Sequence, residues 1–427
     1  MFCDSPPCVE EEESEESILI HRTDALVAPD EELFLASAGQ NDEFQTGNFT
    51  TIIEPVFCNA SLSLAQPGYR VDSIYPSEFA VPLYGQVMPV LLIVTVIANT
   101  LIILVLSKRH MRSPTNMVLL AMALADMFTM LFPSPWLFYI YTLENYTEPI
   151  HPVSVCYAYV FMQEVMPNLF HTASIWLTLA LAIQRYIYVC HPTVAVTWCT
   201  LPRVKWAIGW IFFLATLHQM THLMTFNFKP QLTCHEGRVI ESCNTILAVW
   251  LHGWEDYYYN LYYWFRVLFV HTLPCIVLVM LNLRLFSALR AAEEKRRRLV
   301  RDNRNSKESR KMRDSQSTTF MLIVVVTVFL IVEIPLAVIT TLHIISVTTG
   351  MDALDYSKLP VMILFSNFVI ACSYPINFAI YCGMSKVFRQ TFSELFISST
   401  TKGAAEVGNS RYSVANGTRT QTNETVV

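Results

Sequence analysis

Seven long apolar segments constrain this chain more than any other feature of its sequence. They lie at residues 84–106, 116–141, 155–183, 206–226, 259–286, 318–345 and 359–384. An apolar helix of about 20 residues crosses the roughly 30 Å hydrocarbon core of a bilayer, because each residue adds about 1.5 Å. Seven such segments are too many for the core of one soluble domain. The sequence therefore predicts an all-α membrane protein, a bundle of seven transmembrane helices.

The composition agrees with a membrane protein and gives no support to an enzyme. Of the 427 residues, 53% are hydrophobic and 15% are charged, and the net charge is −6. The sequence shows no glycine-rich phosphate loop, no cluster of metal ligands and no nucleophile placed beside a base. A seven-helix transporter would call for inverted repeats or interrupted helices, and neither is visible. We expect no catalysis, no cofactor and no nucleic acid partner.

Basic residues predict how the bundle is oriented in the membrane. Lys and Arg concentrate in the connections that follow the first, third and fifth segments. They include Lys108, Arg109, Arg112, Arg203 and Lys205, and a dense group at 290–313. Short connections rich in Lys and Arg stay in the cytosol. The amino terminus is therefore expected outside the plasma membrane, and the carboxyl terminus in the cytosol.

This orientation divides the chain into three parts. Residues 1–82 form an acidic extracellular tail that we expect to be disordered, and residues 83–384 form the bundle. Residues 385–427 form a short amphipathic helix on the membrane surface and a cytosolic tail. Three Asn-X-Ser/Thr sequons fall on the outer side and predict glycosylation at Asn48, Asn59 and Asn145.

Ionisable residues inside the apolar segments are costly to insert into a membrane, so each is expected to have a bonding partner or a function. The segments contain Asp126, Glu164, Arg266 and Glu333. Each costs roughly 2.5–3.5 kcal/mol to insert, so four unpaired charges would cost on the order of 10 kcal/mol. Further polar residues accompany them: Asn99, His171, Ser174, His271 and Asn367. We expect these side chains to face a shared interior.

Five motifs in order resemble those of the rhodopsin-like (class A) G-protein-coupled receptors. They are "IANTLIILVL" with Asn99, "ALAD" with Asp126, "QRYIYVCHP" with Arg185, "VEIPLAV" with Pro335 and "SYPINFAIY" with Pro375. Each motif alone is weak, but all five fall on the expected segments. The resemblance covers essentially the whole bundle and implies the receptor fold.

The chain departs from the family pattern at informative positions. The family usually has an acid before the arginine of the third helix, and here it is Gln184. It usually has a tryptophan two residues before the proline of the sixth helix, and here it is Glu333. The residues of the family's sodium site are half kept: Asp126 and Ser174 match, whereas positions 370 and 371 are apolar. A sodium ion at Asp126 and Ser174 is therefore an open expectation.

Within the family, the longest strings resemble the arthropod receptors for sex peptide and myoinhibitory peptides. These strings include "PLYGQVMPVLLIVTVIANTLIILVL", "WLTLALAIQRYIYVCHP" and "SYPINFAIYCGMS". The resemblance implies short secreted peptide ligands with two tryptophans and an amidated carboxyl terminus. It also implies coupling to Gi/o proteins, which lower cyclic AMP. A retinal receptor would need a lysine in the middle of the seventh helix, and the lysines there stand only at its ends. An amine receptor would need an acid in place of Pro167 or Asn168, and Glu164 is one helical turn too high.

A candidate ligand site follows from one face of the third helix. Glu164, Asn168 and His171 stand at i, i+4 and i+7, which places them on one side of a helix. Trp136 and Trp264 would offer aromatic surface to the tryptophans of a peptide. Two readings of the remaining charges stay open. Glu333 either pairs with Arg266 or accepts hydrogen bonds from the peptide, so the predicted ligand site includes both residues. Pro167, next to Asn168, predicts a kink.

The cytosolic end carries the expected contacts with signalling partners. The resemblance implies that Arg185, with Tyr186 beside it, receives the G protein. Gln184 offers that arginine a hydrogen bond in place of an ion pair, so the resting state should be held weakly and show basal signalling. Serines and threonines from 393 to 425 predict receptor kinases and arrestin as partners. The terminal Thr425 and Val427 fit a PDZ ligand.

The cysteines divide between the two compartments. Cys156 stands at the outer end of the third segment, and Cys234 and Cys243 stand in the outer loop between the fourth and fifth. The oxidising exterior permits a disulfide there. We expect Cys156 to pair with Cys243, with Cys234 as the alternative.

Overall fold

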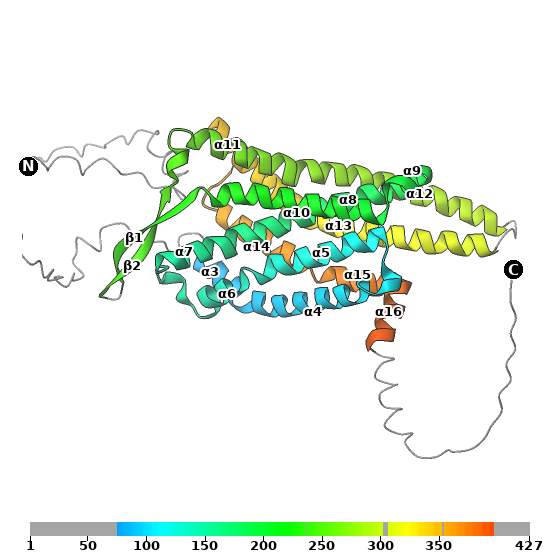
Figure 1. The fold of residues 1–427 in the computed structure, drawn as a ribbon, viewed down its shortest axis with the longest axis horizontal. Helices are drawn as coiled ribbons and strands as arrows, with labels where there is room; N and C mark the ends of the chain where they lie inside the picture. The colour runs from blue at the N-terminus through cyan, green and yellow to red at the C-terminus, as the bar shows by residue number, and fades with distance from the viewer. Residues whose placement is uncertain (1–74, 236, 302–305, 352–353, 397–427) are drawn as a thin grey trace, which may run out of the picture.

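The computed structural model describes residues 75–235, 237–301, 306–351 and 354–396 of the chain (Figure 1). The predicted glycosylation sites Asn48 and Asn59, the PDZ ligand at Thr425 and Val427, and the serines and threonines beyond residue 396 lie outside the described residues.

Seven helical rods run side by side and form the bundle (Figure 1). In chain order they comprise α3 (Ser77–Ala80), η1 (Val81–Val87) and α4 (Met88–Leu106); α5 (Pro114–Leu131), α6 (Ser134–Leu137) and η3 (Phe138–Thr142); α7 (Val153–Val160), η5 (Phe161–Val165) and α8 (Met166–Cys190); α10 (Leu201–Leu223); α11 (Glu255–Phe265), η7 (Arg266–Thr272) and α12 (Leu273–Arg301); α13 (Ser306–Thr349); and α14 (Leu359–Ser373) with α15 (Ile376–Met384). We call these rods the first to seventh helices. The seven predicted segments all lie within or largely within them.

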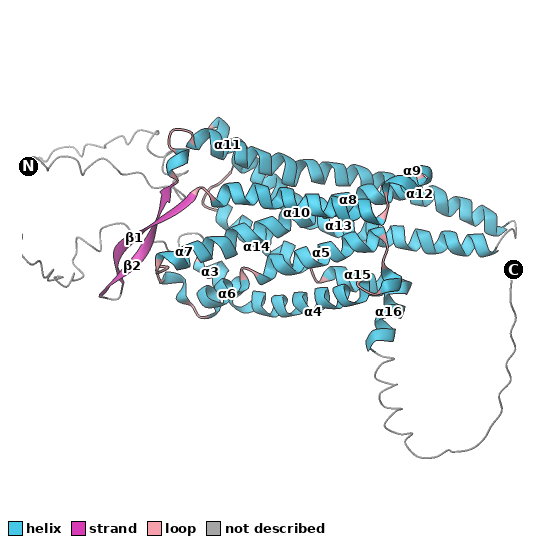
Figure 2. Ribbon diagram, in the orientation of Figure 1, coloured by secondary structure: helices cyan, strands magenta, loops and turns pink. Residues whose placement is uncertain are grey.

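Short elements connect the rods at both ends of the bundle. Helical connections are η2 (Arg109–Met111), η4 (Asn145–Thr147), α9 (Pro192–Trp198) and η6 (Val249–Leu251). Strands β1 (Phe226–His235) and β2 (Arg238–Leu247) form an antiparallel hairpin between the fourth and fifth helices (Figure 2). We call the end with β1 and β2 the hairpin end, and the end where α12 and α13 project the basic end.

Six of the seven rods are long and apolar enough to cross a membrane. Within the described residues, α10 is the rod that falls short of that combined criterion. Its 23 residues would extend about 35 Å, so its length suffices. Its polar side chains are what lower its hydropathy, and they include Arg203, Lys205, His218, Gln219 and His222.

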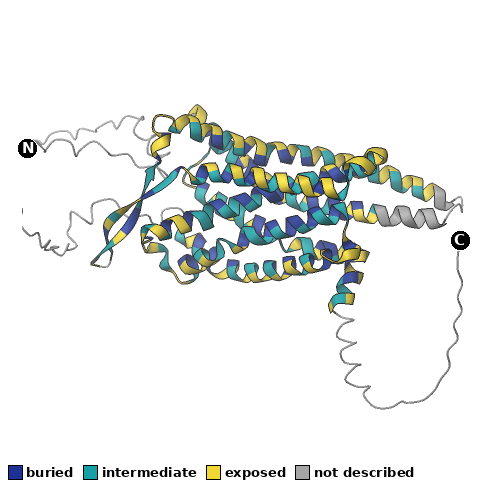
Figure 3. Ribbon diagram, in the orientation of Figure 1, coloured by how far each residue is buried: buried dark blue, intermediate teal, exposed yellow. Residues whose placement is uncertain are grey.

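The interior of the bundle is apolar and is organised around the third helix. The part of that helix nearer the basic end, α8, packs against α5, α10, α12 and α13. Leu177 and Leu181 of α8 are fully buried in this core. Buried residues face inward and exposed apolar residues face outward along the rods (Figure 3). An apolar exterior of this kind is what a hydrocarbon surrounding requires.

Prolines set the positions of the irregular turns. Three of the four π-helical turns in the described residues end two residues before a proline, at Pro89, Pro167 and Pro274. Proline has no N–H, and its ring collides with the carbonyl four residues earlier. A wider turn relieves that contact, as where the Met166 N–H bonds to the Phe161 carbonyl, five residues back. The predicted kink at Pro167 therefore takes the form of a π turn.

The fifth helix continues beyond the bundle at the basic end, as the projecting part of α12 (Figure 1). The Arg297 and Arg298 guanidinium groups lie 2.9 and 2.6 Å from the carboxylates of Glu293 and Glu294, each one helical turn earlier. These side chains are largely exposed, so each pair adds only about 0.3–0.5 kcal/mol to helix stability.

The surface helix predicted after the bundle is α16 (Lys386–Phe396), which turns away from the bundle axis (Figure 1). Phe388 anchors it, with 2% of its surface exposed, and Thr391 lies 2.8 Å from the His110 ring. Val387 and Phe396 stay exposed on the two flanks of this anchored face. This amphipathic arrangement suits a helix that lies in the membrane interface.

Gly85 allows the first and second helices to meet backbone to backbone at the hairpin end. A Cβ atom at this position would lie 2.5 Å from the Tyr141 carbonyl oxygen, and the Thr142 hydroxyl donates to the Gly85 carbonyl at 2.8 Å. Gly85→Ala is therefore expected to destabilise the protein by about 1–3 kcal/mol, the usual cost of overpacking. Thermal unfolding of the detergent-solubilised protein measures the effect.

Gly209→Ala is the matched control, because a Cβ atom on that exposed α10 residue meets nothing within 4 Å. Alanine favours a helix by up to about 1 kcal/mol over glycine, so the Tm of Gly209→Ala should equal or exceed that of the wild type. Equal Tm values for the two variants would contradict the close packing at Gly85.

Candidate functional site

A cavity of about 700 Å³ opens between the helices toward the hairpin end. All of the helices except the fourth contribute to its walls. Tyrosines form much of the upper wall: Tyr75, Tyr84, Tyr141, Tyr159 and Tyr263. Polar side chains gather deeper: Glu164, Asn168, His171, Arg266 and His271. A volume of this size, apolar with a few convergent polar groups, is typical of a ligand site.

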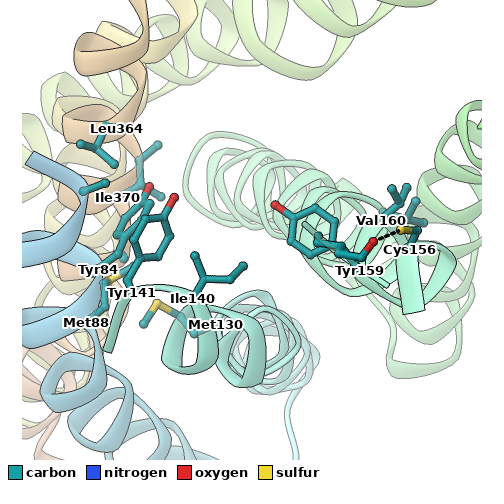
Figure 4. Close-up of a cluster of buried hydrophobic side chains, with 14 of the residues drawn as sticks. Tyr84, Met88, Met130, Ile140, Tyr141, Cys156, Tyr159, Val160, Leu364 and Ile370 are labelled. Carbon is teal, nitrogen blue, oxygen red and sulfur yellow. Dashed lines mark hydrogen bonds between the residues drawn. The ribbon is translucent and has the colours of Figure 1, made fainter. Parts of the chain in front are cut away.

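The aromatic wall is held by packing around the buried core of the hairpin end. Figure 4 shows Tyr84 and Tyr141 side by side, with Tyr159 set apart from them. The Tyr84 and Tyr141 rings pack edge to face, with 5.5 Å between their centroids. All three rings line the cavity, so a ligand would meet fixed aromatic surfaces on both sides.

Four of the seven residues predicted to bind ligand line this cavity, namely Glu164, Asn168, His171 and Arg266. The two predicted tryptophans do not. Trp136 instead packs edge-on against Tyr159, at 5.2 Å between centroids, and so supports the wall from behind. Trp264 is half-buried outside the lining, because Tyr263 faces inward and the next helical position points about 100° away.

Arg266 pairs with a different partner from the expected one. Its guanidinium donates a 2.7 Å hydrogen bond to the Asn168 side-chain oxygen, which joins the fifth helix to the third. Of the two readings left open for Glu333, the pair with Arg266 is wrong, because the described contacts of Glu333 are with His171 and His271. Arg266 remains in the cavity wall, available to an acceptor on a ligand.

Glu333 lies directly beneath the cavity and is held by two histidines. Its side chain is fully buried and does not line the cavity. One carboxylate oxygen lies 2.7 Å from His271 Nδ1, and the other lies 3.4 Å from His171 Nε2. The other nitrogen of His171 lies 3.4 Å from the Tyr374 hydroxyl. Glu333 therefore ties the sixth helix to the third and fifth.

Asp126 sits at the centre of a second, smaller polar site. Its buried carboxylate accepts hydrogen bonds from the Ser174 hydroxyl at 2.6 Å and from the Asn377 amide at 3.2 Å. A cavity of about 20 Å³ adjoins these groups, enough for one water-sized particle. Asn377 is a residue that the sequence reasoning missed, although it stands two places after Pro375 in the quoted motif. Sodium binding at Asp126 and Ser174 stays a prediction.

The other family-type residues have structural positions in the bundle. Asn99 is fully buried and donates to the Thr95 carbonyl at 3.1 Å, within its own helix. Pro335 lies inside α13, and Pro375 separates α14 from α15. Both prolines interrupt the ladder of backbone hydrogen bonds, as the missing N–H requires.

Arg185 lies near the end of α8 at the basic end and has no ionic partner among the described residues. Its guanidinium carbon lies 5.7 Å from the centre of the Tyr188 ring, and its Nε has no hydrogen bond. Gln184 is buried, and neither atom of its amide has a partner. The expected hydrogen bond between Gln184 and Arg185 is therefore absent. Tyr186 packs edge-on against His191, at 5.7 Å between ring centroids.

A disulfide joins Cys156 to Cys243, as predicted, and fixes the hairpin to the start of the third helix. Cys234, the alternative, is itself disulfide-bonded and does not compete for Cys156. The Phe228 N–H adds a 3.1 Å hydrogen bond to the Tyr157 hydroxyl. Asn145 lies in η4 at the same end, where its amide donates to the Tyr139 carbonyl; its glycosylation stays a prediction.

Comparison with known proteins agrees with the motifs. A family model described as 7 transmembrane receptor (rhodopsin family) matches residues 98–389. The sex peptide receptor of Drosophila melanogaster is 51% identical over 356 residues, which are 82% of this chain and 81% of that protein. Sex peptide receptor-related protein 2 of Caenorhabditis elegans is 33% identical, over 80% and 77% of the two chains. The FMRFamide receptor of Drosophila melanogaster is 24% identical, over 73% and 53%.

Proposed function

The chain belongs to the rhodopsin family of seven-transmembrane G-protein-coupled receptors, with neuropeptides as its ligand class, and on that premise we propose which peptide it binds. The ligand is a short secreted peptide of the myoinhibitory type, with two tryptophans and an amidated carboxyl terminus. Sex peptide, after which the Drosophila relative is named, is a second candidate. The receptor signals through Gi/o and lowers cyclic AMP.

The observation that carries this proposal is a cavity lined by tyrosines and, deeper in the bundle, by polar side chains that include Glu164 and Arg266. Tyrosine rings pack well against tryptophan, and aromatic pairs add about 0.5–1.5 kcal/mol beyond the burial of area. A terminal carboxamide both donates and accepts hydrogen bonds, so it can donate to Glu164 while it accepts from Arg266. A free carboxylate can accept from Arg266 but has no N–H to donate to Glu164. The cavity therefore favours an amidated peptide.

We place the hairpin end outside the cell and the basic end in the cytosol. Disulfides persist in oxidising compartments, and the Cys156–Cys243 bridge is at the hairpin end. Lys and Arg concentrate in cytosolic connections, and the projecting part of α12 carries Arg296, Arg297 and Arg298. In this orientation the cavity opens toward secreted peptides, and Arg185 faces the G protein.

Further partners of the cytosolic side are proposed on sequence grounds alone. Serines and threonines beyond Ser393 suit receptor kinases and arrestin, and the terminal Thr425 and Val427 suit a PDZ groove. Membrane lipid would contact α16. A sodium ion at Asp126 and Ser174 would be held by carboxylate and hydroxyl oxygens.

The test is a cyclic AMP assay in transfected cells with an amidated peptide that contains two spaced tryptophans, alongside its free-acid twin. We expect the amide to lower forskolin-raised cyclic AMP, and the acid to need a concentration at least 10-fold higher. Arg266→Ala should raise the half-maximal concentration of the amide by about 10–100-fold. That corresponds to the loss of a charge-assisted hydrogen bond of about 1.5–3 kcal/mol.

Arg290→Ala is the matched control, because that arginine lies over the Phe286 ring on the far part of α12. Its half-maximal concentration should equal that of the wild type. A rise in cyclic AMP would contradict the Gi/o assignment. Equal potency of acid and amide, or no response from receptor confirmed at the cell surface, would remove the assignment of the peptide.

A further inference from the structure

Three side chains from three helices converge beneath the ligand cavity. They are His171 of α8, His271 of η7 and Glu333 of α13. One nitrogen of each imidazole and one carboxylate oxygen all lie within 4.8 Å of one another. Among the described residues, no other group of three histidine, cysteine or acidic side chains meets this condition.

Among the residues that the structure describes, no lysine or arginine forms an ion pair with this cluster. Glu333 is fully buried, and its ion-pair contacts are with the two histidines. The nearby basic residue, Arg266, hydrogen-bonds Asn168 instead. Cys275 of α12 also faces the carboxylate, and it brings no positive charge. With neutral imidazoles the cluster carries a charge of −1, and a buried carboxylate of this kind calls for a cation.

Two polar atoms of the cluster lack a hydrogen bond. They are His171 Nε2 and the Glu333 carboxylate oxygen that faces it across 3.4 Å. Ligand atoms bound to one tetrahedral zinc ion, with bonds of about 2.0–2.2 Å, lie about 3.3 Å apart. The two unsatisfied atoms already have this separation. His271 Nδ1 contacts the other carboxylate oxygen at 2.7 Å, and the three ligand atoms of the cluster lie within 4.8 Å of one another, so small side-chain movements would bring them onto one ion.

We propose that His171, His271 and Glu333 form a binding site for Zn²⁺ or a chemically similar divalent transition metal ion. Two imidazole nitrogens and one carboxylate oxygen are a donor set that zinc prefers, whereas Mg²⁺ and Ca²⁺ prefer oxygen alone. His171 and His271 line the cavity, so the ion enters from there, and water fills the fourth position. Where His271 Nδ1 carries a proton, that proton passes to solvent as the metal binds.

An ion at this site would have a mechanical consequence for the receptor. Its ligands belong to the third, fifth and sixth helices, so a single ion fixes the spacing of all three. An ion that binds one arrangement of these helices better than another shifts the receptor toward that arrangement. Zinc thus acts as a regulator of the peptide response from a position that leaves most of the cavity free.

Thermal unfolding of the purified full-length receptor in detergent tests the site without any peptide. At ZnCl₂ about 100-fold above the dissociation constant, we expect Tm to rise by about 5 °C or more, and EDTA to reverse the rise. MgCl₂ should have no effect. His171→Ala, His271→Ala and Glu333→Gln should each lose the zinc shift. His218→Ala and His222→Ala, which change histidines of α10, should keep it.

A further variant keeps the test decisive if a ligand substitution prevents folding. His171→Cys replaces an imidazole by a thiol, which binds Cd²⁺ more strongly than the imidazole does. We expect the Cd²⁺ shift of His171→Cys to exceed that of the wild type. No zinc shift in the wild type would overturn the site, as would an equal shift in the wild type and every folded ligand variant. Because no agonist is present, these outcomes are independent of the peptide assignment.

Discussion

Glu333→Ala is expected to remove most of the correctly folded receptor from the cell surface. The carboxylate is fully buried, hydrogen-bonds the buried His271 ring at 2.7 Å and lies 3.4 Å from the partly buried His171 ring, so its loss leaves His271 without its partner and removes the charge between the two rings. Removing one partner of a buried pair costs about 3–5 kcal/mol. Total stabilities are only about 5–15 kcal/mol, so this is a large fraction.

Flow cytometry of an epitope-tagged receptor measures the surface fraction, and thermal unfolding measures the stability of what remains. Glu148→Ala is the control, because its carboxylate lies at the surface, where it accepts a hydrogen bond from the Tyr139 hydroxyl. Glu333→Gln keeps the shape and one acceptor oxygen, so its surface fraction and its Tm should lie between those of the wild type and Glu333→Ala. If Glu333→Ala matches the wild type in both measurements, the carboxylate does not hold the three helices together.

The partners of Glu333 illustrate which parts of the site can be predicted from sequence. The position of a charge along an apolar segment gives its depth, and Glu333 and Arg266 are at compatible depths. Depth does not give the direction of a side chain around its helix. In an α-helix, residues five apart point about 140° away from each other. Arg266 and His271 are five apart, and yet both line the cavity.

The π turn η7 accounts for this difference. Its wider turn brings residues five apart onto the same face, so His271 joins the polar floor beside Arg266. A periodicity of 3.6 residues cannot anticipate such a shift. The prolines do mark its place, because the turn ends two residues before Pro274. Proline spacing is thus the signal by which this part of the site could have been found.

The helices themselves were predictable because the thickness of a bilayer sets their length. The hairpin of β1 and β2 was not predicted, although its loop and Cys243 were identified. Strand pairing depends on a turn at Gly237, which adopts a positive φ of 76°. The fold of the membrane part therefore follows from hydropathy. The fold of the outer loop follows from the turn at Gly237 and from the disulfides of Cys243 and Cys234.

Arg185→Ala is expected to abolish peptide-stimulated signalling, with a loss of at least 100-fold in response, while surface expression is retained. Arg185 has no carboxylate partner in the described part of the chain, so its removal leaves no buried charge unpaired. In the proposed orientation this guanidinium faces the cytosol, and we propose it as the group that receives the G protein. Binding of labelled peptide to intact cells should stay within about 3-fold of the wild type, because the cavity is at the other end of the bundle.

Gln184→Glu tests how strongly Arg185 is restrained in the resting state, before peptide binds. A carboxylate beside Arg185 would supply the ion pair that the glutamine does not, worth about 1.5–3 kcal/mol when hydrogen-bonded. If that pair forms only in the resting state, the active fraction without peptide should fall about 10-fold for each 1.4 kcal/mol. Basal nucleotide exchange in membranes, normalised to receptor number, measures this fraction.

Gln184→Leu separates the effect of charge from the effect of substitution. The Gln184 amide is buried with both polar atoms unsatisfied, so an apolar side chain of similar size should be tolerated. We expect Gln184→Leu to keep the basal activity of the wild type, whereas Gln184→Glu loses it. Equal basal activity in all three proteins would mean that Arg185 is restrained by something other than a neighbouring acid. The weak resting state inferred from Gln184 would then be wrong.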